Sequence, residues 1–324
     1  MNELLNLDTL YQAEIFPYFA GLPDERGRNK SYELADIWGS CFAMFSLKSP
    51  SLLAFEERLA QEEVNNRSVY HLRAIPSDSQ LRNILDKIAD SSWDKLYPCL
   101  PHRLEKTGKL NGYYQWGKRL LISIDGTRFF SSKKILCPCC LTQKDKKGQV
   151  TYGHGLLSAV VVCPERQAVF PMAHEPLSKQ DGETKNDCEL NAVKRLLVKL
   201  QTHYSDKKFL FVEDALYANA PHIEQLLAMD AQHIIGVKPE SHTCLFSQVK
   251  RAAQTGKLKT KVLTNSKKQV QEIYRYVPNL RLNQAHNIRL NGVSYERWEN
   301  GKRTPLFTWI TNRNVSVRNV DKIA

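Results

Sequence analysis

Two carboxylates in the sequence each follow a run of β-strand formers. Asp125 comes after the segment RLLISI at 119–124 and precedes Gly126, and Asp214 comes after KFLFVE at 208–213. A buried strand that ends in an acid presents that acid at the edge of a sheet where ligands commonly bind. Asp125 with Gly126 would, on its own, more simply open a turn. The second strand of the same design favours a paired site.

A pair of carboxylates at adjacent strand ends is a suitable donor set for Mg²⁺ or Mn²⁺. These hard ions prefer oxygen ligands and are often held by one or two protein carboxylates together with phosphate. Two such ions about 4 Å apart can activate a hydroxyl and stabilise the leaving oxygen in phosphoryl transfer. We therefore expect Asp125 and Asp214 to be catalytic metal ligands, with a third acid elsewhere. Glu213 should point to the opposite face of its strand, because side chains alternate.

The elements around these acids follow a recognisable order. Apolar patterning predicts three antiparallel strands, with a hairpin turn at 164–167, and then helix, strand, helix and strand. The predicted ranges are 113–125, 150–163, 167–172, 187–203, 208–214, 218–229 and 233–237. This is the order of an RNase H-like fold, in which the first and fourth strands are neighbours. Asp125 and Asp214 would then meet at the centre of the sheet.

The whole chain is accordingly predicted to be α/β, with an RNase H-like mixed sheet flanked by helices. Residues 1–112 form a helical region with helices near 32–45, 52–59, 76–88 and 93–104, the last broken at Pro98 and Pro101. This region is either a DNA-binding bundle or a scaffold. Residues 113–239 are the catalytic core, 240–311 a β-rich basic insertion, and 312–324 the start of a C-terminal helical part.

The charge of the chain indicates a polyanionic partner. Its 46 Lys and Arg exceed its 34 Asp and Glu, which gives a net charge of +12. An excess of this size most often accompanies nucleic-acid binding. In the insertion we expect double-stranded DNA to contact basic side chains, and Trp298 to stack on a flipped base or else lie in the core. The expected DNA-binding residues are Lys250, Arg251, Lys257, Lys259, Lys261, Lys267, Lys268 and Trp298, and Arg275 belongs to the same basic run.

The sequence favours a cytoplasmic, nucleoid-associated protein. No apolar run approaches the roughly 18 residues that span a bilayer. The N-terminus MNELLNLDTL lacks the basic region of a secretory signal. Eight cysteines in such a chain are expected to be reduced.

One group of cysteines, CPCC at 137–140, raises the question of zinc. Cys137, Cys139 and Cys140 with His154 are candidate ligands, and Cys163 or Cys188 could join them. The spacing does not follow the paired C-x-x-C pattern of structural zinc sites, so ordinary thiols are the favoured interpretation. The acid-rich segment 181–189 and His174-Glu175 are likewise interpreted as a solvated loop and helix start rather than a metal or DNA site.

An ordered set of motifs resembles the DDE transposases of bacterial insertion sequences, in the cut-and-paste group with a β-strand insertion in an RNase H-like core. The motifs are KSPSLL at 48–53, SIDGT at 123–127, CCLT at 139–142, QDGETKNDCE at 180–189, VEDALYAN at 212–219 and GVKP at 236–239. The resemblance implies Mg²⁺-dependent DNA cleavage and strand transfer, with Asp125 and Asp214 as two members of the metal-binding triad. It also implies a dimer on DNA, because two transposon ends are paired.

The third member of the triad should be a Glu on a helix after the insertion. The chain stops at Ala324, where that helix should begin, and Glu296, Glu299 and Asp321 are poor substitutes. We therefore expect a C-terminally truncated transposase that binds DNA and cleaves it poorly. The alternatives are a non-catalytic DNA-binding relative that inhibits the full-length enzyme, and a structure-selective nuclease on the same fold.

Overall fold

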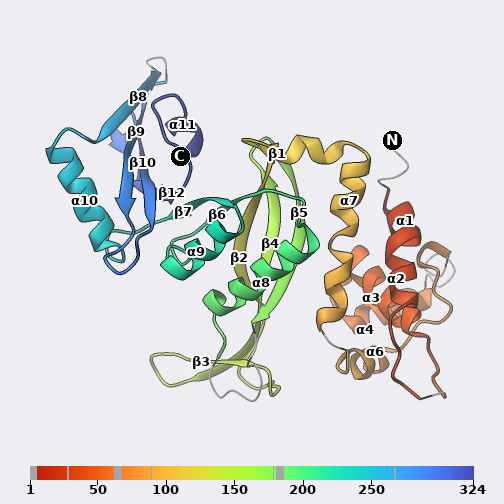
Figure 1. The fold of residues 1–324 in the computed structure, drawn as a ribbon. Coiled ribbons are helices and arrows are strands. Elements are labelled where there is room, and N and C mark those ends of the chain that lie inside the picture. The colour runs from red at the N-terminus through yellow and green to blue at the C-terminus, as the bar shows by residue number, and fades with distance from the viewer. Residues whose placement is uncertain are drawn as a thin grey trace. The chain divides into compact units, whose positions relative to one another are not determined.

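The chain folds into two compact units, Met1–Asn111 and Gly112–Ala324. The computed structural model describes residues 6–27, 29–61, 68–88, 90–177, 179, 186–265 and 268–324. The first unit is helical, and the second is built on one large sheet (Figure 1). The protein is thus mixed α/β, with a mixed sheet flanked by helices.

The first unit is a set of short helices around an aromatic core. Trp38 is buried and packs edge-on against Trp93, with ring centroids 4.2 Å apart. Gly39 lies on the same helix, and a Cβ there would meet the end of the Leu72 side chain at 2.6 Å, so this side chain would have to shift to admit a larger residue. The helices are α1 (Leu7–Leu10), η2 (Tyr11–Ile15), α2 (Phe16–Ala20), α3 (Leu34–Ser46), α4 (Leu52–Gln61), α6 (Asp78–Leu85), η3 (Asp90–Leu96), α7 (Cys99–Lys106) and η4 (Lys109–Tyr113), which crosses into the second unit.

The prediction of one helix over 93–104, broken at two prolines, was wrong in its details. Pro98 does separate η3 from α7, because it is the residue that precedes α7. Pro101 lies within α7 and does not break it. The first turn of a helix has no intrahelical use for its N–H groups, so proline is tolerated there. Ser77 caps α6 by accepting a hydrogen bond from the Gln80 N–H.

The second unit contains a 12-stranded sheet whose main order is β3-β4-β2-β6-β7-β12-β10-β9-β8. β5 pairs with β4 antiparallel, β4 with β2 antiparallel, and β2 with β6 parallel. The first and fourth predicted core strands are therefore hydrogen-bonded neighbours. The strands are β1 (Tyr114–Gln115), β2 (Arg119–Ser132), β3 (Leu141–Lys144), β4 (Val150–Cys163), β5 (Arg166–Leu177), β6 (Phe209–Glu213), β7 (Gln232–Gly236), β8 (Lys259–Asn265), β9 (Val270–Arg281), β10 (Arg289–Glu299), β11 (Lys302–Arg303) and β12 (Phe307–Thr311).

The central strands are buried on both faces. On one face, α8 (Glu189–His203) turns its apolar stripe of Ala192, Val193, Leu196, Leu197 and Leu200 towards β4 and β5, and α9 (Ala220–Ala228) follows it (Figure 1). On the other face, Leu121 and Leu210 pack in one cluster with Val320 and Ile323 of α11 (Val320–Ile323).

No helix among the described residues is long and apolar enough to cross a membrane.

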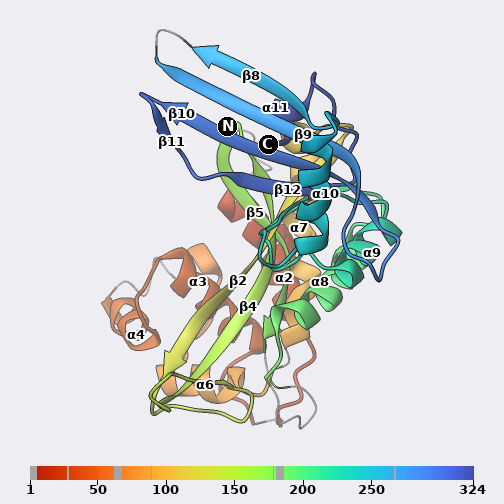
Figure 2. The same ribbon diagram turned by 90° about the vertical axis from the view of Figure 1, so that its left-hand side faces the viewer.

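Three elements differ from the sequence prediction. β2 does not end at Asp125, because it continues to Ser132 as a ribbon with β4. β3 was not predicted, since four residues are too short to show a period. The basic segment after residue 240 is not purely β-rich: it begins with α10 (Thr243–Gln254), which carries Lys250 and Arg251 and contacts β9 (Figure 2). Its strands join the core sheet, because β12 pairs with β7.

His233 makes the stability of the second unit depend on pH. Its side chain is fully buried, and neither ring nitrogen has a hydrogen-bond partner among the described residues. Burial, and then the neighbouring His222, lower the pKa of His233 to about 4. The unfolded state therefore binds more protons than the folded state between pH 6.5 and 4, so stability is lost as the pH falls through this window.

We expect acidification from neutral pH to about pH 4 to remove about 3 kcal/mol through His233 alone. The measurement is the free energy of unfolding across this range for the natural chain and for His233→Leu. The variant should show a shallower pH dependence by that amount. Parallel curves for the two proteins would contradict the assignment.

Candidate functional site

Asp125 lies within β2, and Asp214 directly follows β6, the parallel neighbour of β2. β2 and β6 pair as far as Ser123↔Val212, and the same register continued by two residues sets Asp125 beside Asp214. Side chains alternate along a strand. Because Leu121 and Leu210 face α11, the two acids project from that same face, away from α8 and α9. Both are exposed to solvent.

Backbone hydrogen bonds orient each carboxylate and leave one of its oxygens available. Asp125 Oδ1 accepts the Gly126 N–H at 2.9 Å, and Asp214 Oδ1 accepts the Leu216 N–H at 2.8 Å. Neither acid forms an ion pair with a described residue. Two adjacent negative charges without a cation repel each other, so this end of the sheet favours binding of a positive ion.

Glu189 is a third carboxylate at this end of the sheet, and the sequence interpretation did not single it out. Its carboxylate lies against the backbone beside Asp125, since a Cβ on Gly126 would sit 2.5 Å from Glu189 Oε1. Glu189 Oε2 accepts a hydrogen bond of 3.2 Å from the Tyr217 hydroxyl. The backbone N–H of Tyr217 donates a hydrogen bond to the Asp214 carbonyl and so closes the turn that begins at Asp214.

Glu189 approaches from the opposite face of the sheet from the two aspartates. It begins α8, and Gly126 alternates with Asp125 along β2, so its contact lies on the α8 face. Burial and then the Glu189 charge raise the pKa of Tyr217, which keeps its hydroxyl a hydrogen-bond donor. In the sequence, Glu189 is recognisable only as an acidic residue at the start of a helix. Acids are common at that position, so this feature does not distinguish it.

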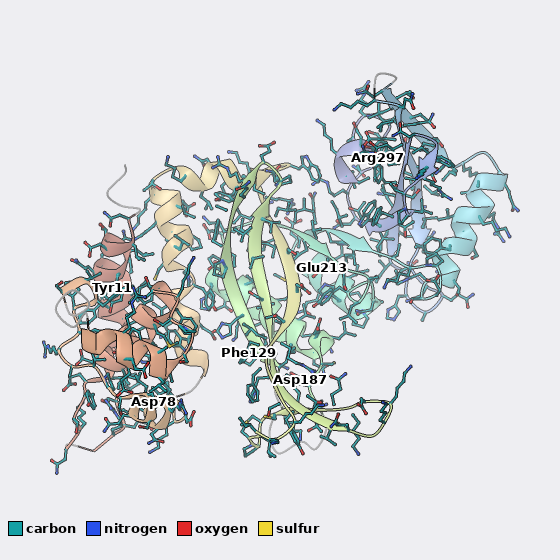
Figure 3. The ribbon with its side chains drawn as sticks, turned by 180° about the vertical axis from the view of Figure 1, so that it is seen from behind. Tyr11, Asp78, Phe129, Asp187, Glu213 and Arg297 are labelled. Atoms are coloured by element: carbon teal, nitrogen blue, oxygen red, sulfur yellow. The ribbon has the colours of Figure 1, made fainter. Side chains whose placement is uncertain are left out.

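Glu213 is buried and takes no part in the exposed pair, as the alternation predicted. It bonds to His222 Nε2 at 2.8 Å through Oε2. Burial raises the pKa of Glu213, although the hydrogen bond to His222 acts in the opposite direction. Figure 3 labels Glu213 within the second unit, and the residue supports the packing of α9 on β6.

The three other acids considered for the triad are engaged elsewhere. Glu296 is buried between Arg275 at 2.6 Å and Arg303 at 2.5 Å. Glu299 pairs with Arg297 at 3.1 Å. Asp321 pairs with Lys261 at 2.8 Å, and it lies on the short helix α11. Among the described residues, none of these joins Asp125 and Asp214.

The segment around Asp187 is structural where it is described. Asp187 pairs with Arg195 at 2.6 Å, and the same arginine bonds Glu175 at 2.5 Å (Asp187 is labelled in Figure 3). Lys199 also pairs with Glu175 at 2.9 Å. These contacts fix the start of α8 against β5. Residues 181–185 of the acid-rich segment lie outside the described part of the chain.

The expected DNA-binding residues do not form one uniform stripe. Lys261 is paired with Asp321, and Arg275 with Glu296. Lys259 lies 5.9 Å from the ring centre of Tyr276. Lys250, Arg251, Lys257 and Lys268 are exposed, Trp298 is 36% exposed at the end of β10, and Lys267 lies outside the described residues.

A second basic surface, absent from the sequence prediction, extends beyond Asp125. We call residues 126–154 the finger: the far half of β2, the connection to β3, β3 itself, the turn after it, and the start of β4 (Figure 1). It carries six basic residues and the single acid Asp145. None of the six forms an ion pair with a described residue, and all are exposed. They are Arg128, Lys133, Lys134, Lys144, Lys146 and Lys147.

The finger also brings together one group of potential metal ligands. Cys137, Cys140 and His154 place their side-chain donor atoms within 4.8 Å of one another. Cys139, Cys163 and Cys188 do not belong to this group. Cys163 instead lies near the Gly112 carbonyl, at 3.7 Å.

Compared with known proteins, the chain matches no protein-family model and shows no significant match to a curated protein.

Proposed function

We propose that this chain is a transposase-like protein of the DDE type, which binds double-stranded DNA and holds Mg²⁺ or Mn²⁺ with Asp125 and Asp214. The observation that carries the proposal is the pairing of β2 with β6, whose register, continued by two residues, sets two exposed aspartates without ion-pair partners among the described residues side by side. The strand order β5-β4-β2-β6-β7, three antiparallel and then parallel, supports an RNase H-like core. The strand order is thus a second line of support for the proposal, beside the resemblance of the sequence motifs to DDE transposases.

The donor set fits a hard divalent cation. Each aspartate spends one oxygen on a backbone N–H and keeps the other free for a metal. When bound, the ions supply Lewis-acid stabilisation of charge on the phosphodiester oxygens. Asp125 and Asp214 would hold the ions in position. Glu189 contacts the backbone at Gly126 and accepts a hydrogen bond from Tyr217, which belongs to the turn that begins at Asp214. Gly126 is needed because any side chain there would displace Glu189.

The charge of the second unit suits a duplex substrate that continues past the two acids. β2 leads directly from Asp125 into the finger, whose net charge is about five positive by counting its six basic residues and one acid. Lysine and arginine contacts to phosphates give affinity without sequence specificity. We propose that the finger and α10 contact DNA on this basis, with two chains pairing two DNA ends as a dimer.

The second candidate is a DNA-binding relative without cleavage activity. It is favoured by one observation: among the described residues, no third carboxylate stands with Asp125 and Asp214 on their face of the sheet. Both candidates predict DNA binding. Incubation of residues 1–324 with supercoiled DNA and Mg²⁺ or Mn²⁺ distinguishes the two candidates. Nicking by the natural chain that is absent in Asp214→Asn supports a transposase that cleaves DNA. DNA that stays intact with the natural chain supports the relative without cleavage activity.

Salt dependence tests the proposed DNA surfaces. Replacing Lys144, Lys146 and Lys147 by Ala should lower the slope of log K against log salt by about 3, because each phosphate contact contributes about 0.9. Replacing Lys250 and Arg251 should lower it by about 2. The matched control is Lys261→Met, since Lys261 is already paired with Asp321 and should change the slope little. Fluorescence anisotropy with a labelled duplex measures all three, and equal slopes throughout would contradict these surfaces.

A further inference from the structure

The connection from β2 to β3 in the finger lacks an apolar core of its own. Ile135 and Leu136 are 67% and 58% exposed, and Phe129 on β2 is 67% exposed (Phe129 is labelled in Figure 3). A loop of this kind gains little from hydrophobic burial. Its one tightly buried side chain before β3 is Cys140, which is 2% exposed. Something other than apolar packing is needed to hold the loop in place.

Three soft donor atoms converge where this loop meets β4. Cys137 Sγ and Cys140 Sγ are 3.6 Å apart, and each lies 3.3 Å from His154 Nε2. Tetrahedral zinc with ordinary bond lengths separates two sulfurs by about 3.8 Å and a sulfur from a nitrogen by about 3.6 Å. The observed triangle is within about 0.3 Å of that pattern. One ion above its plane would reach all three atoms at bonding distance.

Two-centre hydrogen bonds alone cannot satisfy all three contacts of this triangle. Each thiol has one hydrogen, and His154 Nε2 either accepts one hydrogen or donates one. If Cys137 donates to Cys140 and Cys140 donates to His154, the 3.3 Å contact between Cys137 and His154 has no hydrogen in it. A cation, by contrast, uses a lone pair of all three atoms at once. A disulfide does not explain the group either, because a sulfur–sulfur bond is about 2.05 Å long.

The backbone already has the form of a metal-binding turn. Cys137 and Cys140 are the two ends of a C-x-x-C segment, and the Cys140 N–H donates to the Cys137 carbonyl at 3.1 Å. The Cys137 N–H points at Cys140 Sγ, at 3.2 Å. His154 comes from β4, which Leu141 pairs with at Gly153. The second half of the donor set is thus a strand residue 14 positions further on, rather than a second C-x-x-C pair.

We propose that Cys137, Cys140 and His154 bind one Zn²⁺, which pins the β2–β3 connection to β4. Two thiolates and an imidazole select zinc over Mg²⁺, because they are soft or borderline ligands. The fourth position is taken by water or by a ligand outside this group. The ring of Phe129 lies nearly parallel to that of His154, with ring centroids 6.1 Å apart. The site is structural, and it keeps the basic side chains of the finger in a fixed arrangement beyond Asp125.

The direct test is the zinc content of purified residues 1–324, prepared without chelators under reducing conditions. The natural chain should contain about one zinc per chain, and Cys140→Ser and His154→Ala should each contain less than about a tenth of that. Cys139→Ser is the matched control, because it removes a neighbouring thiol of the same turn that is not in the triangle. It should keep its zinc, and so should Cys188→Ser.

Cobalt substitution gives a readout that does not depend on how the protein was purified. Co²⁺ added to the metal-free chain should produce a thiolate-to-cobalt absorption band, which Zn²⁺ then removes. The band should be lost in Cys140→Ser and retained in Cys139→Ser. Absence of both zinc and the cobalt band in the folded natural chain would overturn the proposal, and so would equal loss in Cys139→Ser and Cys140→Ser.

Limited trypsin digestion separates the local role of zinc from general misfolding. Chelation should speed cleavage after Lys133 and Lys134 by at least about tenfold while peptides from α8 and β6 stay protected. Cys140→Ser should be cut at this fast rate with or without chelator, and unchanged rates would contradict the pinning role. None of these measurements involves DNA, Asp125 or Asp214, so the zinc site and the proposed function stand or fall separately.

Discussion

Asp125→Asn and Asp214→Asn should each lower the affinity of the chain for Mn²⁺ by at least about 100-fold. Each substitution keeps the size of the side chain and removes the negative charge that a divalent ion requires. The remaining aspartate then offers a single carboxylate, which holds such ions weakly in water. Titration calorimetry or Mn²⁺ electron paramagnetic resonance on the metal-free chain measures the loss.

The control for this pair is an exposed acid at the opposite end of the same sheet. Glu165 lies in the turn between β4 and β5 and is exposed, so Glu165→Gln should leave Mn²⁺ affinity unchanged. Glu189→Gln should have an intermediate effect, because Glu189 contacts the backbone at Gly126 from the other face. Equal affinity in the natural chain and both aspartate variants would show that these carboxylates do not form a metal site.

Phe211→Ala should destabilise the second unit by about 3–5 kcal/mol. The ring of Phe211 is fully buried on the face covered by α8 and α9, and it lies beside Ile122 in the parallel pair. Its removal takes away the transfer free energy of a large apolar group and leaves a cavity. Because Phe211 anchors β6 three residues before Asp214, Mn²⁺ affinity should also fall.

Hydrogen exchange of the β6 and β2 amides measures this loss, since it reports on the second unit separately from the first. The matched control is Phe129→Ala, which removes the same ring from a site that is 67% exposed. Its effect on the β6 amides should stay within about 0.5 kcal/mol. If the two variants exchange alike at β6, then the packing described for this strand is wrong.

The core strands could be predicted from the sequence because they are long and strongly patterned. β4 was predicted with its bounds, and the hairpin to β5 followed from the Pro164 turn. The order of the elements predicted that β2 and β6 are neighbours. The alternation of side chains along β6 predicted that Glu213 points to the opposite face from Asp214. These are features that local composition and connection rules determine.

Other parts depended on contacts that no local pattern records. Asp125 was predicted to end its strand because the run of β-strand formers stops there, yet pairing with β4 continues β2 to Ser132. The finger was missed as a basic surface because its lysines are spread over the β2–β3 connection, β3 and the turn after β3. His154 lies 14 residues from Cys140, and only the β3–β4 pairing brings them together.

The basic residues of the insertion show the same limit. Charge counting treats Lys250 and Lys261 alike, whereas Lys261 is neutralised by Asp321 from a segment 60 residues away in sequence. Glu296 was a poor candidate for the triad by its strand-like context, and the structure shows in addition that two arginines enclose it. Pairing of this kind is decided by tertiary structure, so sequence alone overestimates the free charge.

The most direct test of the central claim is to map the metal by iron-mediated cleavage of the polypeptide. Fe²⁺ bound in place of Mg²⁺ reduces added hydrogen peroxide to hydroxide and a hydroxyl radical, which cuts the backbone next to the ion, and added ascorbate returns Fe³⁺ to Fe²⁺. We predict cuts near residues 125 and 214 that Mg²⁺ suppresses by competition and that the Asp125→Asn, Asp214→Asn double variant lacks. Cuts near 137–154 would come from the Cys–His group and should disappear in Cys140→Ser instead. Absence of cuts at 125 and 214, or their persistence in the double variant, would contradict the assignment of these two aspartates as a metal site.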